Sequence, residues 1–315
     1  MPHAETRQPA GREPGQRRFA LYAWGVLGYN LAVILWGAYV RASGSGAGCG
    51  NDWPRCNGQV APVSPSGATL IEFTHRAMTV LDLVLVAALL AWAFRAFGAR
   101  HRATLGAALA SLFLLTEALI GAALVLLDHV ARNASLNRAY SLSTHLINTL
   151  TLLACLALTA WWAGGRPAAN PRGPGAWPAA ASLGLFMVLG VSGAIAALGD
   201  TLFPARTLAE GFAQDMNPAA NVFLRLRLWH PVLAACVTLW LALYGAVGIA
   251  RRPDVRLGAG IVMTLAGLQL SVGMANLFLR APIWMQLVHL LVADLLWISL
   301  VLFCATLLSA PARKS

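Results

Sequence analysis

The chain has 315 residues, of which 58% are hydrophobic and 11% are charged. This charged fraction is about half of that found in soluble domains and argues against a water-soluble globule. The net charge of +11 would suggest a nucleic-acid partner in a soluble protein. Here the basic residues lie between long apolar stretches and form no stripe that follows a phosphate backbone. The composition indicates an integral membrane protein that binds a lipid bilayer and no nucleic acid.

Eight apolar stretches are long enough to cross a bilayer, which takes about 20 residues per helix. In chain order they cover residues 19–40, 70–94, 103–127, 140–163, 177–199, 226–250, 257–279 and 283–308. Spans of this length form helices, because lipid offers no hydrogen-bond partners to an open backbone. We therefore expect an all-α fold with eight transmembrane helices. The first stretch is too long for a secretory signal and has no clear cleavage site, so we expect it to be retained.

The distribution of arginine predicts the orientation. With an even number of helices, both ends of the chain lie on one side of the membrane. That side has more basic residues than the other, and its tails contribute Arg7, Arg12, Arg17, Arg18, Arg313 and Lys314. The positive-inside rule then predicts a multi-pass protein of the cell inner membrane with both termini in the cytoplasm.

The first four helices resemble the last four at an offset of about 150 residues. The matched pairs include Gly37 with Gly193, Glu117 with Gln269, and Gly121 with Gly273. A repeat of four helices keeps the same orientation, so we expect two tandem four-helix bundles related by a pseudo-twofold axis along the membrane normal. The predicted divisions are a tail 1–18, a first bundle 19–163, a cytoplasmic linker 164–176, a second bundle 177–308 and a tail 309–315.

Four histidines follow the same repeat. His75 matches His230, and His145 matches His289, each a few residues into an even-numbered helix that enters from the outer face. A satisfied core residue is the plainer interpretation of any single histidine, but it does not explain four at duplicated positions. Two opposed imidazoles in an apolar four-helix bundle are typical of haem ligation. Zinc would need three or four clustered ligands at each site.

Carboxylates distinguish the two halves. Glu72, Asp82 and Glu117 lie at membrane depth in the first half, whereas the second half has one such residue. Ionisable groups in a membrane usually mark function. Three roles are open to Glu72, which shares a helix face with His75: proton acceptor, orienting partner of His75, or ion-pair partner of Arg76. For Asp82 and Glu117, hydrogen bonds between helices are the favoured interpretation.

Arginines near the outer rim suit the two propionates of a haem, because guanidinium is well shaped for carboxylate. The candidates are Arg41, Arg76, Arg225 and Arg227. The alternative for each is an interfacial arginine that extends its charge to water.

Two cysteines, Cys49 and Cys56, share the first outer loop. In an oxidising compartment they are able to form a disulfide. Both a structural and a redox role are open for such a pair.

The residues around these cysteines resemble a known family. The runs GAYVRASGSGAGC at 37–49 and DWPRCNG at 52–58 are similar to the first outer loop of the haem A synthase family. The run EFTHR at 72–76 resembles that family's E-x-x-H-R motif. With the other three histidines in their expected helices, the resemblance covers residues 19–308. The chain departs from the pattern at Pro231, where an arginine is expected after the histidine, and in the loop 200–225, which has no second cysteine pair.

The resemblance implies an oxidoreductase that oxidises a methyl group of haem O to the formyl group of haem A for cytochrome oxidase. We expect two successive oxidations of the methyl, through an alcohol and a hydrated aldehyde, with the cofactor supplying the electron chemistry. The implied partners are haem O, haem A, haem O synthase, the assembly of cytochrome c oxidase and an electron-transfer partner. A di-haem b electron carrier without enzymatic activity and a haem-handling chaperone are the alternatives.

The resemblance also assigns roles to residues. In the first half, the catalytic residues would be Glu72, His75 and His145, with the two histidines facing the iron of haem O. In the second half, His230 and His289 would be the axial ligands of a resident haem b. Cys49 and Cys56 would form the loop's cysteine pair.

Overall fold

The computed structural model describes residues 14–173 and 175–309. These residues form an all-α fold without a β-strand, and eight of their helices are long and apolar enough to cross a membrane. The chain is therefore a multi-pass membrane protein, which confirms the predicted fold class. The helices are α1 Pro14–Ala42, α2 Gly67–Phe97, α3 Arg102–Leu126, α4 Leu136–Ala163, α5 Ala176–Leu202, α6 Leu208–Met216, α7 Val222–Arg227, α8 Trp229–Arg251, α9 Arg256–Phe278 and α10 Ile283–Leu307.

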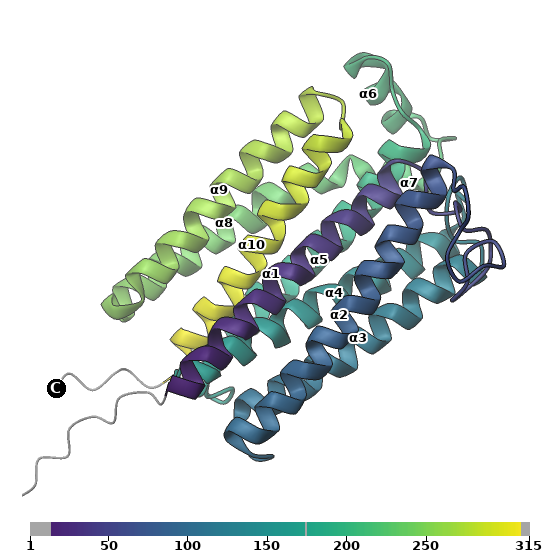
Figure 1. Cartoon of the computed structure of the whole chain (residues 1–315). Helices are drawn as coiled ribbons and strands as arrows, with labels where there is room; N and C mark the ends of the chain where they lie inside the picture. Colours follow the sequence, from purple (N-terminus) through teal and green to yellow (C-terminus); the bar gives the residue numbers. More distant parts are fainter. Residues whose placement is uncertain (1–13, 174, 310–315) are drawn as a thin grey trace, which may run out of the picture.

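The long helices run roughly parallel, with α2 and α3 on one side of the molecule and α8 and α9 on the other (Figure 1). Between them, α4 contacts both α5 and α10, and α1 contacts α10. One continuous core of buried apolar side chains joins all eight long helices. Trp297 of α10 is buried in this core and its indole N–H donates to the carbonyl oxygen of Leu150 in α4, at 2.7 Å. The two halves are thus packed together, while their division at 164–176 and the twofold axis stay predictions.

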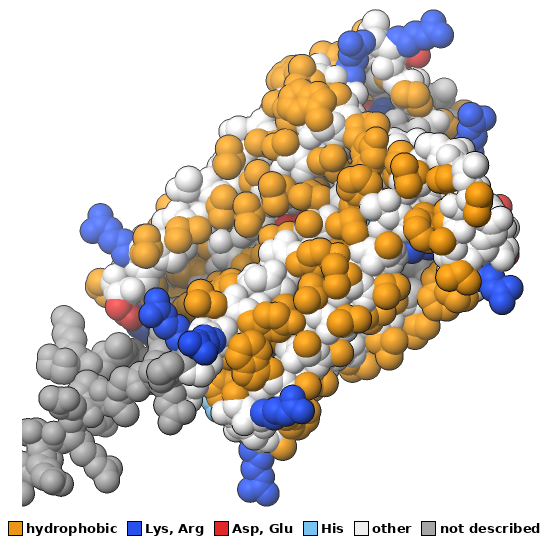
Figure 2. Space-filling view, in the orientation of Figure 1, with side chains coloured by type: hydrophobic (Ala, Val, Ile, Leu, Met, Phe, Trp, Pro, Cys, Tyr) orange, Lys and Arg blue, Asp and Glu red, His pale blue; other side chains and the backbone are white. Residues whose placement is uncertain are grey.

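The surface of the molecule matches a lipid environment. Leucine and valine side chains stay exposed along the long helices. Figure 2 shows hydrophobic side chains along the length of the bundle and basic side chains near its two ends. The start of α1 and the end of α10 lie at the same end of the bundle, opposite α6 and α7 (Figure 1). The tail residues Arg7, Arg12, Arg313 and Lys314 lie outside the described residues.

Several helices are longer than their apolar stretches. The structure begins α1 at Pro14 rather than at residue 19 and extends α2 over Gly67–Phe97 rather than 70–94. Hydropathy locates the part of a helix inside the hydrocarbon, but a helix continues until its backbone is capped. Ser66 caps α2 by accepting a hydrogen bond from the backbone N–H of Thr69, at 3.2 Å.

The segment between the fifth and sixth predicted spans contains the short helix α6 and the start of α7. Thr207 and Glu210 supply the sequence signal that we missed, because the spacing Thr-x-x-Glu is typical of a capped helix start. Thr207 Oγ1 accepts a hydrogen bond from the N–H of Glu210 at 3.1 Å.

The predicted span 226–250 is interrupted near its start. A proline ring conflicts with the carbonyl group four residues earlier, and for Pro231 that residue is Arg227. The structure ends α7 at Arg227 and begins α8 at Trp229. His230 therefore lies in the first turn of α8.

Candidate functional site

Each of the four histidines packs against a glycine of the preceding long helix. The distances from a methyl group added at the glycine to the histidine Cε1 are 2.9 Å for Gly37 and His75, 3.0 Å for Gly193 and His230, 3.0 Å for Gly273 and His289, and 4.0 Å for Gly121 and His145. Three of the four rings thus occupy space that any larger residue would take. These glycines are the ones matched in the sequence repeat, so the two halves share this contact.

The structure brings the histidines together in the predicted pairs. His75 and His145 are close enough to interact electrostatically, and so are His230 and His289. All four rings are partly exposed. The Nδ1 atoms of His75, His145 and His289 are buried without a hydrogen-bond partner, whereas Nδ1 of His230 lies 2.8 Å from Ser192 Oγ.

These residues fit a haem in each half. Two neighbouring imidazoles, backed by glycines and surrounded by apolar helices, would supply two nitrogen ligands to a haem iron. Each of the four rings has at least one nitrogen atom without a hydrogen-bond partner among the described residues, and such a nitrogen is the kind of group that iron binds. Within residues 14–173 and 175–309, the structure has no group of three or more histidine, cysteine or carboxylate side chains that could hold a metal ion.

Glu72 lies at the start of α2 and is 4% exposed. Its Oε1 is 2.5 Å from Nη2 of Arg76, and its Oε2 accepts a hydrogen bond from the backbone N–H of Cys49 at 2.9 Å. Arg76 also donates to the carbonyl oxygens of Asp52 and Arg55, at 2.8 and 2.7 Å. The ion pair, one of the three roles left open for Glu72, is present in the structure. Through Arg76 it also fastens the outer loop to α2.

The outer loop is held at the start of α2. Cys49 and Cys56 form a disulfide, as expected. Gly48 lies so close to α2 that a Cβ atom there would be 2.4 Å from the carbonyl oxygen of Ala68. Thr69 Oγ1 donates to the carbonyl oxygen of Gly48 at 2.7 Å. The loop therefore covers the turn of α2 that carries Glu72.

Glu117 of α3 contacts the second histidine of the first half. Its Oε1 lies 3.4 Å from Nδ1 of His145 and is hydrogen-bonded to Thr149, and its Oε2 accepts from Nδ2 of Asn148 at 2.6 Å. The predicted interhelical hydrogen bonds are confirmed. The contact with His145 was missed, although Glu117 is one helical turn from Gly121, which backs the same ring.

The remaining carboxylate of the first half, Asp82, accepts a hydrogen bond from Nδ2 of Asn30 in α1. This contact confirms its predicted role between helices. In the second half, Gln269 occupies the position that matches Glu117, and its Nε2 lies 3.2 Å from Nε2 of His289. His145 thus has a carboxylate beside it, whereas the matching His289 has an amide.

Arg41 extends from the first half to the second. It donates to the carbonyl oxygen of Ala197 and to Oγ1 of Thr201 in α5, at 3.0 and 2.8 Å. Its other terminal nitrogen donates to Oε1 of Gln286 in α10 at 2.9 Å. Arg41 therefore joins the two halves at the end of the bundle that carries the outer loop.

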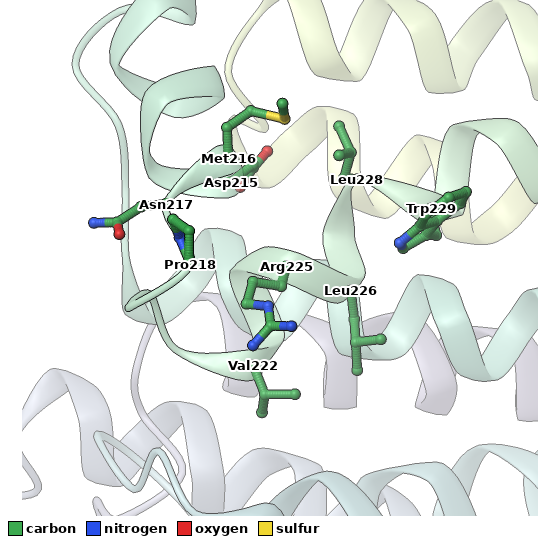
Figure 3. A pocket seen from close by; sticks show the side chains of 9 residues that line it. All are labelled: Asp215, Met216, Asn217, Pro218, Val222, Arg225, Leu226, Leu228 and Trp229. Atoms are coloured by element: carbon green, nitrogen blue, oxygen red, sulfur yellow. The ribbon is translucent and has the colours of Figure 1, made fainter.

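The two arginines of α7 differ in their partners. Arg227 forms ion pairs with Asp200 and Asp215, at 2.7 and 2.6 Å. Arg225 is exposed and lines a pocket of about 390 Å³ together with Trp229 (Figure 3). The guanidinium of Arg225 has no hydrogen-bond or ion-pair partner among the residues that the structure describes. Propionate binding stays a prediction for all four rim arginines, and Arg225 has the guanidinium with the fewest protein contacts.

The chain is similar to known proteins over most or part of its length. The model of the family COX15-CtaA, described as cytochrome oxidase assembly protein, matches residues 20–301. A Thermus thermophilus protein named protoheme IX farnesyltransferase is 46% identical over 308 residues, which are 96% of this chain and 50% of that protein. The heme A synthase of Exiguobacterium sibiricum is 38% identical over 109 residues, 35% of this chain and 37% of the relative. The heme A synthase of Lysinibacillus sphaericus is 42% identical over 96 residues, 30% of this chain and 31% of the relative.

The chain spans half the length of the T. thermophilus relative. The family match instead extends over nearly all the transmembrane helices. The chain therefore belongs to the COX15-CtaA family of cytochrome oxidase assembly proteins.

Proposed function

We propose that this chain is a haem A synthase, an oxidoreductase that converts a methyl group of haem O to the formyl group of haem A. The family and the relatives named heme A synthase support this proposal. The observation that carries it is the contrast between two matching histidine and glycine pairs. The pair in the first half has the carboxylates of Glu72 and Glu117 near it, and the pair in the second half has the amide of Gln269.

In this proposal the first half is the substrate site and the second half holds a resident haem b. His75 and His145 would bind haem O, and His230 and His289 would hold haem b. A bound haem b would supply electron transfer, while the chain binds and orients the reacting methyl group. Glu72 accepts a proton there, because it is a buried carboxylate three residues before His75 on the same helix.

The T. thermophilus relative suggests the source of the substrate. That protein is named for transfer of a farnesyl group to protohaem, and this chain matches half of it. A farnesyl transfer to protohaem makes a farnesylated haem, the chemical class to which haem O belongs. We propose that this chain takes its substrate from such a transferase, namely a haem O synthase, and delivers haem A to the assembly of cytochrome c oxidase. An electron-transfer partner accepts the electrons that the oxidation releases.

For orientation, we propose that both termini are cytoplasmic and that the loop with the disulfide faces the outer side of the inner membrane. The excess of arginine on the side of the termini supports this arrangement. The disulfide supports it independently, because such bonds persist in oxidising compartments.

Pigments extracted from the purified protein test the proposed function. We expect haem B together with haem O or haem A, and a rise in haem A when a haem O synthase is produced in the same cells. Two equivalents of haem B and no other pigment would contradict the proposal and favour the di-haem carrier. Haem O that is bound and released without conversion would favour the chaperone.

A further inference from the structure

A polar cluster of the first half joins α3 to α4 beside His145. The cluster consists of Thr116, Glu117, Asn148 and Thr149. Thr116 Oγ1 donates to Oδ1 of Asn148 at 2.7 Å, and Nδ2 of Asn148 donates to the carbonyl oxygen of Phe113 at 2.8 Å. These two bonds fix the amide, so that its remaining N–H donates to Oε2 of Glu117. The carboxylate is therefore held from the α4 side in one orientation.

The matching positions of the second half are almost entirely apolar. Counted from the matched glycines and histidines, they are Leu268, Gln269, Val292 and Ala293. Oε1 of Gln269 is buried and has no hydrogen-bond partner among the described residues. The second half thus keeps the amide of Gln269 near His289. It lacks polar side chains at the positions of Thr116, Asn148 and Thr149 that would hold this amide in one orientation.

The fixed carboxylate of Glu117 orients the ring of His145. Oε1 of Glu117 lies 3.4 Å from Nδ1 of this residue, which leaves Nε2 as the ring atom for an iron. A carboxylate that accepts from the far nitrogen of a ligating histidine orients the ring and makes it a stronger electron donor. A stronger donor stabilises ferric iron over ferrous iron and lowers the reduction potential.

We propose that Glu117 is a positioning residue that orients His145 and gives the haem of the first half a lower reduction potential than Gln269 allows in the second half. This inference rests on the proposed function, since it requires a haem in each half. It adds to that function a physical reason why the haems bound by two matching histidine pairs would differ in reduction potential.

The test uses the full-length protein in detergent with protohaem IX as the probe. A His289→Ala background removes a ligand of the second half, so that added protohaem reports on the first. The midpoint potential is measured by spectroelectrochemical titration for the parent, Glu117→Gln and Glu117→Asp. We expect a higher potential for Glu117→Gln than for the parent and a value near the parent for Glu117→Asp, which keeps the charge. Glu210→Gln, which changes an exposed carboxylate of α6, serves as the control with an unchanged potential.

The reciprocal experiment keeps the inference testable if Glu117→Gln fails to fold. In a His145→Ala background, Gln269→Glu places a carboxylate beside His289, and we expect the potential of the second-half haem to fall. An unchanged potential in Glu117→Gln, or in Gln269→Glu where the first variant does not fold, would overturn the inference and leave the proposed function standing. Failure of the parent background to bind protohaem in its first half would overturn both.

Discussion

The two halves of this protein share their paired histidines and the glycines behind them, and they differ in the polar side chains near those histidines. In both, histidines two helices apart form a pair, and glycines of the preceding helices back their rings. In the first half, Glu72 lies beneath a disulfide loop and Glu117 is fixed by α4, whereas the second half has Gln269. In the proposed function, the shared histidine and glycine pairs bind haem in both halves, and the carboxylates make the first half the site that reacts. The predictions below test this contrast in order of decreasing expected effect.

The largest expected effect is that of Glu72→Gln. Loss of a general base typically lowers a rate by about 100-fold or more, so we expect haem A formation to fall by at least about 100-fold while haem B stays bound. The rate is measured from the haem A content of membranes with time, and Glu210→Gln is the control. Normal haem A formation in Glu72→Gln would remove the proposed role of this carboxylate.

The glycines that back the histidines provide a matched pair of variants. Gly37→Ala and Gly193→Ala place a methyl group 2.9 and 3.0 Å from the rings of His75 and His230. Loss of a contact that orients a metal ligand typically costs about 10- to 100-fold in affinity for the metal. We therefore expect each variant to weaken haem binding in its own half only. Gly28→Ala, in the same helix as Gly37 but with no atom within 4 Å of the added methyl, is the control. Equal haem titrations for all three proteins would show that the rings do not ligate.

Removal of the disulfide sharpens the contrast between the halves. Replacement of Cys49 and Cys56 by serine frees the loop whose backbone N–H at position 49 donates to Glu72. Native disulfides contribute on the order of 2 kcal/mol, and we expect thermal unfolding at a lower temperature together with reduced haem A formation. Haem B content is expected to stay constant. Parallel loss of haem B and haem A would show that the loop supports the whole bundle rather than the first site.

The smallest expected effect concerns the rim of the second half. Arg227→Gln breaks the ion pairs with Asp200 and Asp215, and we expect a loss of about 1 kcal/mol of stability, measured by thermal unfolding. Arg225→Gln removes a guanidinium without protein partners and is expected to leave the unfolding temperature unchanged. A larger loss of haem B in Arg227→Gln than in Arg225→Gln would mean that Arg227, despite its ion pairs, is the propionate partner.

Much of this contrast could be predicted from the sequence. Apolar stretches of the right length locate all eight long helices. The duplicated spacing identifies the four histidines and their glycines. Both signals can be read from the order of residues along the chain alone. The contact of Glu117 with His145 depends on how α3 and α4 are rotated against each other, which no local pattern encodes. The contacts of Arg41 with α5 and α10 were missed for the same reason. The start of α6 was missed differently, since its capping residues were visible in the sequence.

Pigment analysis of His145→Ala and His289→Ala, compared side by side, tests the central claim most directly. Reverse-phase chromatography of the extracted haems identifies which pigment each variant has lost. The account predicts that His145→Ala keeps haem B and loses haem O and haem A, whereas His289→Ala loses haem B and keeps the ability to bind haem O. Loss of the same pigment from both variants would contradict the division of the molecule into a first half that binds the substrate haem and a second half that holds haem b.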